Sequence, residues 1–490
     1  MKKYLYTVLA ISLSIGCQPE FNDPINEVGF YSSGSADFSN YVAVGNSLTA
    51  GYADNALYLE GQLNSFPSML ANKFSLAGGG DFNQPLVSDN LGGLLVNGQQ
   101  IQGNRLVLEV TAGSQSPVPI EGTPTTDIAN HLEGSFNNMG IPGAKSFHLT
   151  ANTYGNIGNL PAANPYFIRI ASSNQATVIG DAVAQDPTFF TLWIGNNDIL
   201  SFATSGGVGE DQTGNLDPFT YGSSDITDPN VFANLYNEFL KALTANGAKG
   251  AVANIPDVTS IPYFTTVPYN AIPLDESTAA MLNQAYEPYN NGLQQAALLG
   301  VITDEEATAR TINFKAGQNP VVLLDEDLTD LTFINQGLTN MRQATDKDLI
   351  PLPVSSVLGT LSDPENPNSV IGVSVPLNDS QLLTASEIEL VVTAQRAYNT
   401  TIKTLADQYD IAFVDIQGLM NTLAQEGVSF DGGTITNTFG TGGAFSLDGV
   451  HPTQRGYAVV ANTFIKAINS KYNADLPIVN PGNYPTIFVK

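Results

Sequence analysis

Residues 41–49 read YVAVGNSLT, and the fold class follows from this stretch. The short apolar run Tyr41–Gly45 predicts a buried strand. Asn46 and Ser47 come directly after it, so the serine hydroxyl is expected at the carboxyl end of that strand. In open parallel sheets the ligand site lies beyond the carboxyl ends of the strands. The stretch therefore predicts a serine at the working edge of a sheet.

Further apolar runs alternate with helical patterns along the chain. Buried strands are predicted at residues 189–194, 250–254 and 411–414. Amphipathic helices are predicted at about 229–246, 384–408 and 455–470. Alternating strands and helices are typical of an α/β fold, in which helices cover both faces of a parallel sheet.

Two long stretches, at about 53–130 and 260–380, do not fit this simple alternation. The first contains a predicted strand at Arg105–Val110, and the second contains a predicted helix at about 278–298. We interpret both as insertions that grow from strand ends over the site. They would belong to one domain over residues 37–490 and would not form domains of their own.

Charge and cysteine content exclude several classes of function. The chain has 490 residues and a formal net charge of −28. A surface this negative repels phosphate backbones, so nucleic acid is not an expected partner. Cys17 is the only cysteine, which leaves the folded part without a disulfide, a thiol nucleophile or a cysteine metal site. The acidic run at 324–328 lacks the ligand spacing of a calcium loop and is interpreted as a solvated face.

The first 17 residues predict an export signal. Two lysines precede the apolar run Tyr4–Gly16, which is shorter than the roughly 20 residues that span a bilayer. The run ends in LSIGC, which resembles the lipobox of bacterial lipoproteins and implies a lipid anchor on Cys17. The expected location is then the outer membrane or surface of a Gram-negative bacterium, with residues 18–36 as a tether. An ordinary secretory signal is the alternative.

Serine hydrolysis requires an exposed hydroxyl, a base and donors for the oxyanion. Only three histidines are present, His131, His148 and His451. His451 follows Asp448 by three residues across a glycine turn, so the carboxylate can orient the imidazole. The other two histidines lack such a partner and are expected to be structural or exposed. Two alternatives remain open: Ser47 caps the next helix, or His451 pairs with Asp448 only for structure.

Four short blocks resemble the conserved blocks of the SGNH, or GDSL-type, hydrolases. They are Gly45–Thr49, Asn138–Gly143, Gly195–Asp198 and Asp448–His451, and they occur in the family's order. The resemblance implies a three-layer α/β/α sandwich around a parallel, flavodoxin-like sheet of about five strands, with long loop insertions. One departure is Asn46, which stands where the family usually has Asp and carries no charge.

The resemblance also implies the site residues. Ser47 would be the nucleophile, with His451 as base and Asp448 as its orienter. The oxyanion hole would consist of the backbone N–H groups of Ser47 and Gly143 and the side chain of Asn197. No metal or organic cofactor is expected.

The implied activity is carboxylic-ester hydrolysis by a GDSL-type esterase or lipase. The substrate would be a lipid or fatty-acyl ester, or the O-acyl groups of a carbohydrate. The apolar segments 66–70 and 261–264 would line an acyl groove or belong to the core. The alternative function is a non-catalytic surface lipoprotein that binds glycans.

Overall fold

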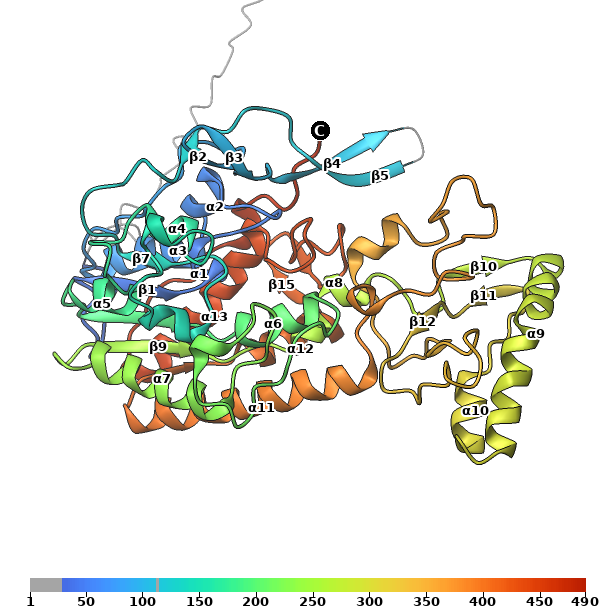
Figure 1. The fold of residues 1–490 in the computed structure, drawn as a ribbon. Helices are drawn as coiled ribbons and strands as arrows, with labels where there is room; N and C mark the ends of the chain where they lie inside the picture. The colour runs from blue at the N-terminus through green and yellow to red at the C-terminus, as the bar shows by residue number, and fades with distance from the viewer. Residues whose placement is uncertain (1–28, 112–113) are drawn as a thin grey trace, which may run out of the picture.

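The computed structural model describes residues 29–111 and 114–490 (Figure 1). The predicted export signal, the lipidation residue Cys17 and residues 18–28 of the predicted tether lie outside the described residues. None of the described helices combines the length and hydropathy that a bilayer crossing requires.

The central sheet is parallel throughout and has five strands. Across the sheet they are β7 (Asn138–Gly140), β1 (Tyr41–Gly45), β8 (Phe189–Trp193), β9 (Lys249–Ala253) and β14 (Ala412–Val414). Numbered along the chain, this order is 2-1-3-4-5, which is the flavodoxin-like order. The predicted fold class is therefore confirmed. Four strands lie at the predicted apolar runs. The strand β7 was not predicted, because Met139 is its only apolar residue.

Alternate residues of β1 enter different cores, as the pleat of a strand requires. Val42 and Val44 pack in a cluster with residues of four helices, which are α5 (Val178–Val183), α6 (Asn197–Thr204), α7 (Pro229–Leu243) and α11 (Ala385–Gln408). Tyr41 and Ala43 pack on the other face with α3 (Phe66–Phe74) and α13 (Gln454–Tyr472). The two clusters make the sheet the middle layer of three.

The covering helices begin at capping residues that the sequence supplies. Asp228 accepts hydrogen bonds from the first N–H groups of α7, and Pro229 occupies the first helical position. Thr384 and Glu387 form a capping box at the start of α11. Thr453 caps α13, so this helix starts three residues after His451. The predicted helices are thereby confirmed to within a few residues.

The stretch 53–130 is partly core and partly surface. Its helix α3 covers the sheet, so the apolar segment 66–70 belongs to the core and not to a groove. Helix α2 (Leu59–Leu63) precedes it. The remaining strands form small surface sheets, which are β2 (Leu94–Val96), β3 (Gln99–Gln102) and β6 (Thr126–Asp127), and the hairpin β4 (Leu106–Thr111) and β5 (Ser114–Pro119).

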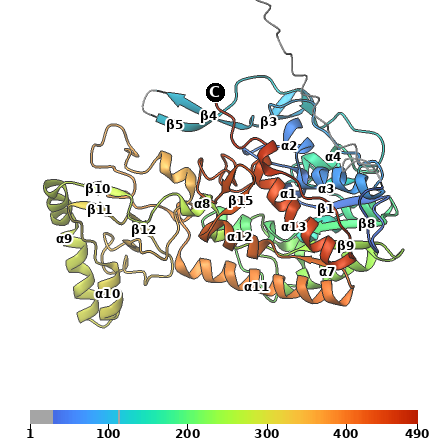
Figure 2. The ribbon, with the colours of Figure 1, turned by 180° about the vertical axis from the view of Figure 1, so that it is seen from behind.

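The stretch 260–380 differs from the expected loop insertion, because residues 267–382 have a hydrophobic core of their own. We call these residues the insertion lobe. Its elements are β10 (Ile272–Leu274), α9 (Glu276–Leu298), α10 (Asp304–Arg310), β11 (Gly317–Asn319), β12 (Val322–Leu324) and β13 (Met341–Gln343). The lobe extends sideways from the sandwich in both views (Figure 1 and Figure 2). The short helix α8 (Pro262–Thr265) lies where it joins the sandwich.

Candidate active site

Ser47 and His451 meet at the carboxyl edge of the sheet. Ser47 is the first residue of α1 (Ser47–Ala50), directly after β1. Its Oγ lies 2.9 Å from Nε2 of His451, although the two residues are 404 positions apart in the chain. The Nδ1 atom of His451 lies 2.9 Å from Oδ2 of Asp448. The hydroxyl and the imidazole that the resemblance implied as nucleophile and base are therefore in contact.

Asp448 is held as a carboxylate by several donors. Its Oδ1 accepts hydrogen bonds from the backbone N–H groups of Val450 and His451, both at 2.8 Å. Burial raises the pKa of Asp448, but the His451 imidazole and the surrounding donors outweigh it and lower the pKa to about 2. An ionised Asp448 favours the tautomer with hydrogen on Nδ1, which leaves the lone pair of Nε2 facing the Ser47 hydroxyl.

The turn that carries the carboxylate and the imidazole depends on Gly449. Its φ is +71°, in the left-handed region that favours glycine. A Cβ at this position would lie 3.0 Å from the backbone nitrogen of Tyr263. The side chain of His451 remains 15% exposed, so the imidazole is open to solvent on one side. The ring of Tyr52 packs against it at 4.7 Å between centroids.

Asn46 supports the turn before Ser47. Its Oδ1 accepts the Leu48 N–H at 3.0 Å, so Asn46, and not Ser47, is the N-cap of α1. The alternative of Ser47 as a helix cap is therefore wrong. The Asn46 amide also donates to Oδ1 of Asn196 at 3.4 Å. This donor bond needs an amide and is unavailable to the ionised Asp that the family usually has there.

Two of the three predicted oxyanion donors follow the strands that flank β1. Gly143 lies three residues beyond β7, and Asn197 begins α6 shortly after β8. The Asn197 amide donates one hydrogen bond to the Ala144 carbonyl at 2.9 Å, which ties the two blocks together. Within residues 29–111 and 114–490, the N–H groups of Ser47 and Gly143 donate to no protein acceptor. Both therefore remain available to an oxyanion.

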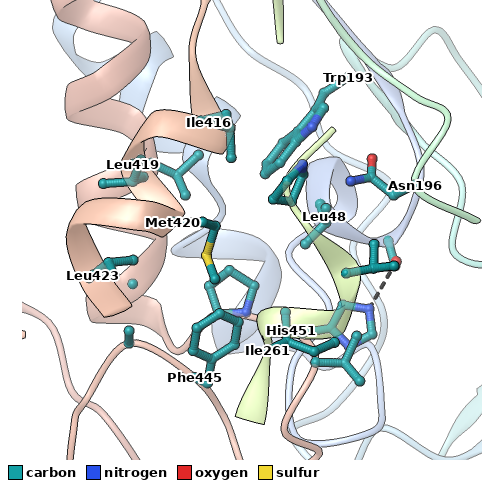
Figure 3. Close-up of a pocket in the computed structure, with 18 of the residues that line it drawn as sticks. Leu48, Trp193, Asn196, Ile261, Ile416, Leu419, Met420, Leu423, Phe445 and His451 are labelled. Atoms are coloured by element: carbon teal, nitrogen blue, oxygen red, sulfur yellow. Dashed lines mark hydrogen bonds between the residues drawn. The ribbon is translucent and has the colours of Figure 1, made fainter. Parts of the chain in front are cut away.

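An apolar cavity opens beside Ser47 (Figure 3). It encloses about 760 Å³ of space between atoms, part of which is open to solvent. Ser47, Asn197 and His451 line it on one side, whereas Gly143 is not among its lining residues. Ile261 also lines it, so the segment 261–264 contributes to the cavity, although Phe264 is buried in the core.

Comparisons of the chain with protein-family models found no match. No curated protein and no solved structure matches it either. The functional inference therefore rests on the geometry of the site.

Sequence reasoning missed Asp54, which is 1% exposed and lies behind the site. Its Oδ1 accepts the Leu447 N–H at 3.1 Å, and its own N–H donates to Oγ of Ser446 at 2.9 Å. Burial raises the pKa of Asp54 to about 6. The pair Asp54-Asn55, both with positive φ, is typical of a turn. No local sequence pattern predicts that Asp54 bonds to Leu447, which is 393 residues away.

The other two histidines are structural or exposed, as predicted. His131 is exposed, and its Nδ1 lies 3.3 Å from the Ile168 carbonyl oxygen. His148 accepts the Lys145 N–H and stacks on Tyr154. Burial lowers the pKa of His148 to about 4, so this ring is neutral at physiological pH.

The acidic run at 324–328 is only partly the solvated face that was expected. Asp325 is buried and pairs with Arg342 at 2.6 Å. Among the described residues, the carboxylates of Glu326, Asp379 and Glu387 lie within 4.8 Å of one another, close enough to hold a metal ion. Glu387 also caps α11, and these carboxylates are not among the residues that line the cavity beside Ser47.

Proposed function

We propose that this protein is a serine hydrolase that cleaves a carboxylic ester through an acyl-enzyme. The observation that carries the proposal is the hydrogen-bonded series Asp448–His451–Ser47, with 2.9 Å at each step. A nucleophile bonded to a base, which is in turn bonded to an orienting carboxylate, is the arrangement that activates a serine. Ser47 follows β1, which pairs with β8 at the point where the strand order reverses, and such folds bind their ligands at that point.

In the first half-reaction, Oγ of Ser47 attacks the ester carbonyl carbon while Nε2 of His451 takes the hydroxyl proton. The backbone N–H groups of Ser47 and Gly143 and the Asn197 amide are proposed to stabilise the oxyanion; each such donor contributes on the order of 3 kcal/mol. The bond to the alcohol oxygen then breaks, and His451 returns the proton to the alcohol. In the second half-reaction, water attacks the acyl carbonyl carbon while His451 takes its proton. The bond to Oγ of Ser47 then breaks, His451 returns the proton to Oγ, and the acid is released.

The proposal covers two substrate classes that the sequence suggested, a lipid or fatty-acyl ester and the O-acyl groups of a carbohydrate. From the sequence we also propose export and a lipid anchor on Cys17. A Cys17→Ser variant should then move from the membrane fraction to the soluble fraction. If the Cys17→Ser variant stayed in the membrane fraction, the lipid anchor would be contradicted, but the proposed hydrolase activity would not.

The full chain in detergent tests the activity with p-nitrophenyl acetate and butyrate. Ser47→Ala should lower kcat by at least about 10⁴-fold, because no other group replaces the nucleophile. Ser173→Ala, on an exposed serine, is the matched control and should retain activity. A fluorophosphonate should label Ser47 and no other serine. Labelling of another serine, or activity in the Ser47→Ala variant, would show that Ser47 is not the nucleophile. Glycan binding without turnover of any ester would favour a non-catalytic surface protein.

A further inference from the structure

The cavity beside Ser47 has a polar end and an apolar end. Ser47, Asn197 and His451 lie at the polar end. The apolar wall is formed by α12 (Ile416–Gln425), whose Ile416, Leu419, Met420 and Leu423 point into the cavity (Figure 3). Ile435, in β16 (Gly433–Ile435), which pairs with β15 (Val428–Phe430), adds to this wall.

Buried hydrocarbon lines the part of the cavity that lies away from Ser47. Leu423 is 6% exposed and Ile435 is 1% exposed, and both belong to the core that packs on the sheet. A sugar in this space would leave its hydroxyl groups without hydrogen-bond partners, which is costly. An alkyl chain requires no such partners and gains from each buried methylene.

The two half-reactions place different demands on the groups of the ester. The alcohol must leave before water enters, whereas the acyl group stays on Ser47 through both steps. A buried apolar cavity beside Ser47 therefore suits the acyl group, which stays bound through both steps, better than the alcohol, which must leave.

We propose that the cavity between Ser47 and Leu423 binds the acyl chain of a fatty-acyl ester and limits its length. This inference rests on the proposed serine hydrolase and deepens it. Each added methylene should raise kcat/KM about fourfold, because burying one CH₂ contributes about 0.8 kcal/mol. The rise should stop at the length at which the chain reaches Met420 and Leu423.

The test uses the full chain at one fixed detergent concentration and p-nitrophenyl esters of two to sixteen carbons. Leu423→Trp should lower kcat/KM for the best long-chain ester at least about tenfold, because one or two methylenes of space are worth this much. The ratio of its kcat/KM for that ester to its kcat/KM for the acetate should fall by a similar factor. Ala424→Trp, on the exposed face of the same helix, is the matched control and should leave the profile unchanged.

Leu423→Ala is the second variant and should move the optimum to longer chains. If circular dichroism shows that Leu423→Trp does not fold, the chain-length optimum of Leu423→Ala tests the inference. A pair of substrates, ethyl dodecanoate and dodecyl acetate, separates the acyl side from the alcohol side, and the dodecanoate should be preferred.

Three outcomes would overturn the inference. A profile that peaks at acetate, an optimum that neither Leu423 variant moves, or a preference for dodecyl acetate would each reject the acyl-chain site while the serine hydrolase stands. Failure of the wild type to cleave any ester would reject the proposed function itself.

Discussion

The backbone N–H of Asn55 donates a hydrogen bond to Oδ2 of Asp448 at 3.0 Å. The same oxygen contacts Nδ1 of His451, so Asn55 and the imidazole converge on one atom. The loop after β1 thus carries Ser47 and also holds the Asp448 carboxylate. The neighbouring residue Asp54 anchors the same turn through Leu447 and Ser446. Site geometry therefore depends on two loops at opposite ends of the chain.

Asp448→Asn should lower kcat about 10⁴-fold, with a much smaller effect on KM. The asparagine amide donates toward Nδ1, which favours the tautomer whose Nε2 carries hydrogen and cannot take the Ser47 proton. Steady-state kinetics on p-nitrophenyl butyrate measures the effect. Asp431→Asn, at an exposed aspartate, is the control. A loss below about tenfold would show that Asp448 does not orient the base.

Asn197→Ala should lower kcat about 10²- to 10³-fold, because one oxyanion donor is removed in the transition state only. Asn196→Ala is the matched comparison, since Asn196 lines the same cavity and bonds to Asn46. Its kcat should fall less than about tenfold. A larger loss of kcat in Asn196→Ala than in Asn197→Ala would show that the oxyanion donor is Asn196 and not Asn197.

Acid should remove stability that Asp448 provides. Its folded pKa of about 2 lies below the ordinary aspartate value of 3.8, so the folded state favours the ionised form. This contribution, about 2 kcal/mol, is fully present above pH 3.8 and is lost as the pH falls toward 2. Chemical unfolding of wild type and Asp448→Asn between pH 2 and 5 should show the smaller pH dependence in the variant. Equal slopes would contradict the depressed pKa.

Asp54 should have the opposite effect. Its folded pKa of about 6 lies above the ordinary aspartate value of 3.8, so the folded state favours the protonated form. Stability from this group is present below pH 3.8 and is lost as the pH rises to 6, by about 3 kcal/mol. Asp54→Asn should therefore flatten the fall in unfolding free energy between pH 4 and 7. An unchanged fall over this range would locate the titration in another group.

Much of the fold was predictable because its signals are local. An apolar run followed by polar residues marks a strand and its end, and four of the five sheet strands were found in this way. The short strand β7 was not, since β1 beside it supplies the hydrogen bonds that make it a strand. The separate core of the insertion lobe also had no signal, because it forms from segments up to about a hundred residues apart.

The sequence by itself determined the α/β class and the residue types of the site. The α/β class follows from side-chain periodicity, and the scarcity of histidine limits the choice of base, whereas the full set of site residues is what the resemblance implied. Only the tertiary structure decided that Ser47 and His451 touch, that Asp54 anchors the turn before His451, and that an apolar cavity adjoins them. The reason is physical: contacts across some 400 positions arise from the packing of strands and helices, and no local pattern encodes them.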